Sequence, residues 1–217
     1  MPKLNINIPP LLKYSIQVYR KYASFVFGVM VTYFALGLLP EVYIYFFTPK
    51  NPTTESQIVS FIAAMVRLFL SLGFTKIMYY LIDDRAVKVN DLVNNGRIFL
   101  SYIVAYFLYF FAVLIGLFLL IIPGIYLAVR LQFYPYYIIK EEDTSFTALR
   151  KSWYVTEGFI YELVLFGASV LLLNFLGAVF LGIGLILTYP ITSMATAIVF
   201  NELEAEAEQI PTSKYLP

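Results

Sequence analysis

Long apolar segments alternate with short polar connections along the chain, and this pattern predicts an all-α fold with six membrane-spanning helices. A helix needs about 20 apolar residues to cross a hydrocarbon core roughly 30 Å thick. The predicted spans are residues 24–47, 58–82, 98–122, 125–139, 159–180 and 183–200. The fourth is shorter than the core, so we expect the turn before it to dip into the membrane or to thin it locally.

The third and fourth predicted spans form a hairpin. Pro123 and Gly124 interrupt an apolar run that has no charged residue between Arg97 and Arg130. Unpaired backbone amides are costly in lipid, so such a break must be short and covered by protein. Proline and glycine suit this turn because neither continues a helix well. The sequence therefore predicts that one helix ends and the next begins at Pro123 and Gly124.

Residues 1–23 have helical periodicity outside the spans. Leu12, Ile16 and Tyr19 fall at helical spacing among basic residues. This pattern predicts a short helix that lies in the membrane interface, with Pro10 in its first turn. The alternative is a basic, poorly ordered flank that orients the first span.

The spacing of apolar residues within 140–158 predicts a second interfacial helix on the same side of the membrane. The residues that share its apolar face are Phe146, Leu149, Trp153 and Thr156. Asp143 or Ser145 can cap its start, and the indole of Trp153 suits an interfacial anchor.

Two segments of the chain align with each other. Residues 92–107 match residues 154–169, with Gly96 on Gly158, and each segment leads from a polar connector into a span and a tight turn. The chain is therefore predicted to consist of three hairpin units. Parallel repeats of this kind occur in transporters, and duplication of a stable hairpin without a transport path is the alternative.

Basic residues outside the predicted spans lie almost entirely on one side. Cytosolic loops carry the excess of lysine and arginine, so both termini are predicted to be cytosolic. The opposite side has Lys50 alone, and the eleven residues of the basic side are Lys3, Lys13, Arg20, Lys21, Arg85, Lys88, Arg97, Lys140, Arg150, Lys151 and Lys214. The predicted organisation is an interfacial segment (1–23), a six-span membrane domain (24–204) and an acidic cytosolic tail (205–217).

Composition supports the membrane class and excludes several activities. The chain is 60% hydrophobic and 13% charged, with a mean hydropathy of +0.77, whereas a soluble domain has about 25% charged residues. A net charge of +1 argues against nucleic acid as a partner. Cysteine and histidine are both absent, which excludes disulfides, histidine or thiolate metal sites and Cys or His nucleophiles. We expect no cofactor.

Two arginines, Arg67 and Arg130, fall near the middle of predicted spans. The acids nearest to them lie closer to span ends and are Glu41, Glu162 and Glu202. A charged side chain at this depth is costly, so each arginine either binds an anion such as a lipid phosphate or carboxylate, or is satisfied structurally. The structural alternative is snorkelling, or bonds to tyrosine hydroxyls and to carbonyls freed at Pro123. Asn174 and Asn201 are predicted to bridge helices.

Three segments in the second half of the chain carry a resemblance to a known family. They are IIPGIYLAVRLQFYPYYIIKEE, ALRKSWYVTEG and YPITSMATAIVFNEL. Over about residues 98–204 the chain resembles the membrane domain that precedes glycerophosphodiester phosphodiesterase catalytic domains in some bacteria, and related free-standing six-helix proteins of unknown function. The resemblance implies a bacterial inner-membrane protein. It implies no enzymatic activity, because the metal-binding catalytic domain is not part of this sequence.

The sequence favours a protein that is not an enzyme. Glu162, Glu202 and several serines are present, but no GxSxG elbow, aspartate pair or HExxH string places a nucleophile beside a base. The first functional hypothesis is a structural protein that binds membrane lipids or a protein partner in envelope maintenance. The alternative is a small transporter or lipid-handling protein with an anion site near Arg130. Structural roles at helix ends and interfaces are expected for Pro123, Gly124, Trp153, Gly158 and Glu162.

Overall fold

The computed structural model describes residues 8–47, 54–179 and 184–209, and within these ranges the chain is helical apart from short connections and has no strand, as predicted. The helices are α1 (Ile8–Lys21), α2 (Ala23–Phe47), α3 (Thr54–Ile82), the 3-10 helix η1 (Val89–Leu92), α4 (Gly96–Leu119), α5 (Ile121–Leu131), α6 (Tyr134–Glu141), α7 (Ser145–Val155), α8 (Ile160–Val179) and α9 (Leu185–Gln209). The predicted helix in residues 1–23 is therefore present as α1, with Pro10 in its first turn.

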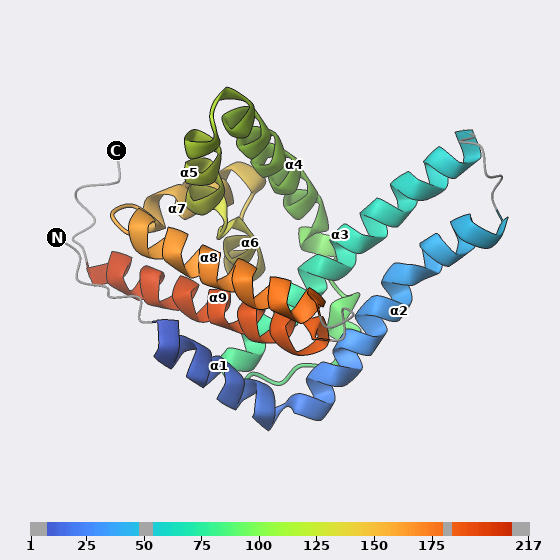
Figure 1. The fold of residues 1–217 in the computed structure, drawn as a ribbon, viewed down its shortest axis with the longest axis horizontal. Coiled ribbons are helices and arrows are strands. Elements are labelled where there is room, and N and C mark those ends of the chain that lie inside the picture. The colour runs from blue at the N-terminus through green and yellow to red at the C-terminus, as the bar shows by residue number, and fades with distance from the viewer. Residues whose placement is uncertain (1–7, 48–53, 180–183, 210–217) are drawn as a thin grey trace.

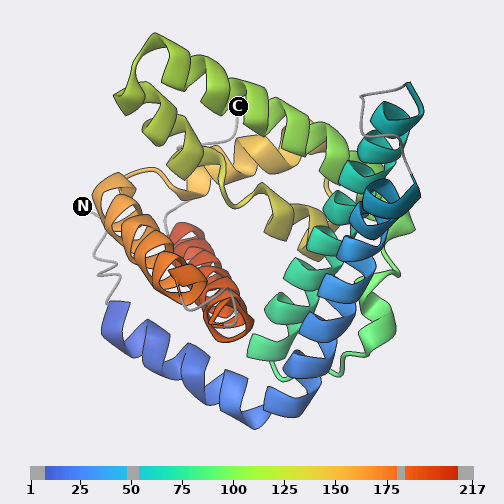
Figure 2. The same cartoon turned by 45° about the vertical axis from the view of Figure 1, so that its right-hand side comes forward.

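Three helical hairpins make up most of the fold (Figure 1). They are α2–α3, α4–α5 and α8–α9, and each follows a short helix: α1, η1 and α7 respectively. The far part of the α2–α3 hairpin extends away from the other helices, whereas α1 lies across α9 (Figures 1 and 2). The sequence predicts a loop over residues 48–57 between the first two spans, but residues 54–57 are helical and belong to α3. Residues 48–53 of that loop, and residues 181–183 of the turn before the last span, lie outside the described residues.

Among the described residues, four helices are long and apolar enough to cross a membrane: α2, α3, α4 and α8. The structure differs from the prediction of six spans at two segments. The predicted span 125–139 is divided between α5 and α6 by a break at residues 132–133. Residues 185–200 of the predicted span 183–200 lie in α9, which contains Pro190 without interruption and continues to Gln209. The first residues of the predicted acidic tail are therefore helical.

The α4–α5 hairpin turns earlier than the sequence predicts. Leu120 is extended (φ −162°, ψ 152°) and separates the two helices, so the prediction of a turn at Pro123 and Gly124 is wrong in position. Pro123 lies in the first turn of α5, where its missing N–H leaves no helical bond unmade. Gly124 permits the close approach of α4, since a Cβ there would lie 2.4 Å from the Leu117 side chain.

Helix α7 covers only the middle of the helix predicted over residues 140–158, since residues 140–141 belong to α6, and it packs through a different face. Its N-cap residue is Thr144 rather than the predicted Asp143 or Ser145, and no side-chain hydrogen bond caps the helix. The face that meets the bundle consists of Ser145, Ala148, Ser152 and Val155. Phe146, predicted to share the apolar face, is 71% exposed. Small side chains let two helix backbones approach closely, which is why this face makes the contact.

The short helix α6 lies at the centre of the core. Its buried residues are Tyr134, Tyr136, Tyr137, Ile138 and Ile139. The Tyr136 ring stacks on Phe200 of α9 with centroids 5.0 Å apart, and it also contacts Tyr79 of α3. The apolar and aromatic part of α6 lies in the interior, where it joins α3 and α9, whereas its last residues, Lys140 and Glu141, are exposed.

The packing of α3 on η1 predicts a large effect at one glycine. A Cβ on Gly73 would lie 2.0 Å from the Leu92 carbonyl oxygen, whereas a Cβ on Gly28 of α2 would meet nothing within 4 Å. We expect Gly73→Ala to lower the unfolding midpoint in detergent, because backbone must move to admit the methyl group. Gly28→Ala is the matched control and should leave the midpoint unchanged or raise it, since alanine favours helix by about 1 kcal/mol. Equal midpoints for the two variants would contradict this packing.

Candidate functional site

Arg130 occupies the last turn of α5 and is 4% exposed. Its guanidinium carbon lies 4.3 Å from the ring centroid of Trp153 on α7 and 5.8 Å from that of Tyr126, one turn earlier on α5. The two rings contact each other edge to face at 5.7 Å. The positive charge therefore lies against aromatic faces, an arrangement that attracts a cation by about 2 kcal/mol when it is desolvated.

The charge of Arg130 has no carboxylate partner among the described residues. The ion pairs there join other groups, and the buried Nε of Arg130 has no hydrogen-bond partner. Arginine N–H groups are strong donors to phosphate and carboxylate oxygens. A buried guanidinium with an unsatisfied donor and no acid beside it is chemically suited to bind an anion.

Beside Arg130, the break between α5 and α6 exposes backbone groups that α7 satisfies. The Ser152 hydroxyl accepts a hydrogen bond from the Phe133 N–H at 3.0 Å and donates one to the Arg130 carbonyl at 3.0 Å. The Thr156 hydroxyl also donates to that carbonyl, at 3.3 Å. The Gln132 amide donates to the Val129 carbonyl at 3.0 Å. The segments PGIYLAVR and SWYVTEG are thus in direct contact.

Sequence reasoning singled out Arg130 and Trp153 separately and did not pair them. It also missed Ser152 and Thr156 as partners of the break. Their spacing of four residues, which places both on one helical face, is the signal that could have found them.

Arg67 lies in a different environment from Arg130. It belongs to the α2–α3 hairpin and forms an ion pair with Glu41, and about half of each side chain is exposed. The two arginines share no partner among the described residues. The carboxylate of Glu41 already supplies the anion that the sequence left open for Arg67.

The other residues singled out from the sequence have structural positions. Gly158 has φ 87°, a conformation that favours glycine, in the turn before α8. Glu162 is half-buried in the first turn of α8, where its negative charge interacts favourably with the helix dipole. It does not pair with Arg130. The Asn174 amide donates to the Thr192 hydroxyl at 3.0 Å and thereby bridges α8 and α9, as predicted.

A charged edge lies where several helices end together. Lys151 of α7 pairs with Glu141 and Asp143, and Arg97 at the start of α4 pairs with Glu142. Lys140 of α6 pairs with Glu204 of α9.

Burial lowers the pKa of Lys151, but hydrogen bonds to Asp143 and Glu141, together with the charges of these carboxylates, outweigh the effect of burial, and the pKa of Lys151 is raised. These pairs join the ends of α4, α6, α7 and α9 at one polar side of the bundle.

Within the described residues, no group of three His, Cys, Asp or Glu side chains could hold a metal ion. The site at Arg130 consists of one cation, two aromatic rings and two hydroxyls whose hydrogen bonds are made to backbone groups. It contains groups that can bind an anion, but no nucleophile beside a base.

The hydrogen bonds of Ser152 predict its contribution to stability. We expect Ser152→Ala to lower the free energy of unfolding by about 2 kcal/mol, because it leaves the buried Phe133 N–H without an acceptor. Ser169→Ala is the control, since within the described ranges the Ser169 hydroxyl donates to the Leu165 carbonyl of its own helix and to no other helix. Reversible unfolding of both variants in the same detergent measures the difference. A Ser152→Ala variant as stable as Ser169→Ala would show that the break does not depend on this hydroxyl.

Comparison of the chain with protein-family models, with curated proteins and with solved structures finds no match.

Proposed function

We propose that the protein is a non-catalytic integral membrane protein that binds an anionic lipid group at Arg130 and has a structural role in the cell envelope. The resemblance of residues 98–204 supports the bacterial inner membrane as its location. The excess of basic residues on one side supports cytosolic termini.

Exposed apolar side chains support insertion into lipid. Phe118, at the end of the α4–α5 hairpin, is 90% exposed, and Ile121 and Ile122 beside it are also largely exposed. In water, a contiguous apolar surface of this kind marks an interaction site or promotes aggregation. When the same apolar surface faces lipid acyl chains, it is not exposed to water and carries no such penalty.

The observation that carries the proposed binding function is the unpartnered guanidinium of Arg130. Taking a charged group out of water costs several kcal/mol even after the protein relaxes around it, and Arg130 is buried. Contact with Trp153 and Tyr126 offsets part of this cost, but it gives the buried Nε no acceptor. A phosphate or carboxylate oxygen would provide both the acceptor and the opposite charge.

Substitution of Arg130 tests lipid binding. We expect Arg130→Gln, purified in mild detergent, to lose anionic phospholipid that the parent retains, because glutamine keeps donors but removes the charge. Mass spectrometry of the extracted lipids measures the loss. Arg150→Gln is the control, since Arg150 is an exposed arginine of α7. Unchanged lipid content in a folded Arg130→Gln variant would make Arg130 a purely structural residue and would refute the proposed site.

A second candidate function is transport or lipid handling, and the break between α5 and α6 favours it. Discontinuous helices form the binding sites of many transporters, with ligands held at the helix ends. Here the break adjoins a buried cation. This function requires a water-filled path to the break, whereas the structural role does not.

Labelling at the break distinguishes the two functions. Because the chain has no cysteine, Gln132→Cys introduces a single thiol at that point. For the structural protein we expect no reaction with a membrane-impermeant maleimide in intact membranes, and full reaction after denaturation. Lys88→Cys, on an exposed connector, is the positive control in inverted vesicles. Rapid labelling of Gln132→Cys in native membranes would favour the transporter instead.

A further inference from the structure

Helix α1 is fixed beside the ends of two candidate spans. A single residue, Tyr22, separates it from α2. Asp84, just after α3, accepts hydrogen bonds from the Lys21 ammonium at 2.7 Å and the Tyr22 hydroxyl at 2.8 Å. These bonds lower the pKa of Asp84, so its carboxylate is charged at neutral pH. The start of α2 and the end of α3 are therefore joined to α1 at a polar elbow.

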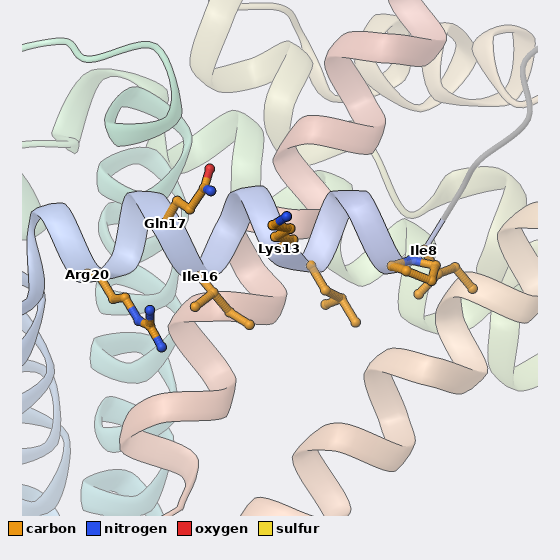
Figure 3. A pocket seen from close by; sticks show the side chains of 7 residues that line it. Ile8, Lys13, Ile16, Gln17 and Arg20 are labelled. Carbon is orange, nitrogen blue, oxygen red and sulfur yellow. The ribbon is translucent and has the colours of Figure 1, made fainter.

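The two faces of α1 have different surroundings. One face buries Leu11, Ser15 and Val18 in the bundle, where α1 contacts α9. The other carries a groove of about 530 Å³ (Figure 3). The groove is lined by Ile8, Pro9, Leu12, Lys13, Ile16, Gln17 and Arg20. Because all of these residues belong to α1, the groove lies on an open face of the helix.

Cations and aliphatic side chains alternate along this groove. Lys13, Ile16 and Arg20 are three and four residues apart and form one helical stripe. Figure 3 shows Ile16 and Arg20 extending from the same side of the helix. Lys13 and Arg20 are two turns apart, about 10 Å along the axis. Helix α1 contains no acid, and neither cation has a carboxylate partner within the described part of the chain.

We infer that this groove binds anionic phospholipid at the membrane surface. With α2 and α3 across the bilayer, the elbow at Tyr22 holds α1 at the level of the headgroups. There Ile8, Leu12 and Ile16 meet acyl chains while the two cations meet phosphates. An acidic protein surface would match the cations but not the aliphatic stripe. The inference assumes membrane insertion and is independent of the Arg130 site, which lies on other helices.

A fluorescent probe in the groove tests this assignment. Gln17→Cys, the only thiol in the chain, is labelled with an environment-sensitive dye in the full-length protein. We expect its emission to shift to the blue when phosphatidylglycerol, but not phosphatidylcholine, is titrated into the detergent-solubilised protein. Neutralising Lys13 and Arg20 together to glutamine should weaken this response about thirtyfold, since each cation contributes to binding an anionic surface. High salt should weaken the parent's response as well.

Two control variants make the outcome decisive. The double variant Lys88→Gln with Arg150→Gln removes the same charge from exposed positions outside α1 and should respond like the parent. Arg130→Gln should also respond like the parent, so a failure of the Arg130 site is distinguished from a failure of the groove. Equal responses to the two lipids, or an unchanged response after neutralising Lys13 and Arg20, would overturn the inference. So would a co-purifying protein that shields the dye until it is removed, because the occupant would then be protein.

Discussion

The hydroxyl of Ser152 makes the central break in the fold possible. Between α5 and α6 the Phe133 N–H and the Arg130 carbonyl leave the helical ladder inside an apolar interior, and one side chain bonds to both. Each such group would cost about 1–3 kcal/mol if it were left unsatisfied. Docking of α7 therefore stabilises the turn of the chain at this point. The path of α6 into the core depends on a helix that follows it in sequence.

The same docking places the aromatic group over the buried cation. Ser152 and Trp153 are consecutive residues of α7, so the register that satisfies the break also fixes the indole against Arg130. Beyond the break, α6 stacks Tyr136 on Phe200 and joins α3 to α9. The ion pairs of Lys151 then hold the end of α6 to α7 at the charged edge. Core packing, the cation site and the polar edge are thus linked through one short helix.

The sequence predicted the hairpins and the helices α1 and α7 because hydrophobic length and helical periodicity are local properties. The break at residues 132–133 has a local signal that the predicted span 125–139 did not use. Pro135 has no N–H to bond to the Leu131 carbonyl of a continuous helix, and it lies instead in the first turn of α6. The turn at Leu120 was misplaced because Gly124 serves the crossing of α4 and α5 rather than the turn. Pairs between distant residues, such as Arg67 with Glu41 and Arg130 with Trp153, depend on tertiary packing that no local pattern contains.

The two arginines show how surroundings decide the chemistry of the same side chain. Arg67 is half exposed and has a carboxylate, so a further anion would have to displace Glu41. Arg130 is buried and has only ring faces, worth about 2 kcal/mol, whereas burying an ion costs several kcal/mol. The balance is therefore unfavourable even before the unsatisfied Nε is counted. A neutral ligand could accept from that nitrogen but would leave the charge uncompensated. An anion would accept a hydrogen bond from Nε and would also compensate the positive charge. Binding of an anion at Arg130 would therefore stabilise the fold that creates the site.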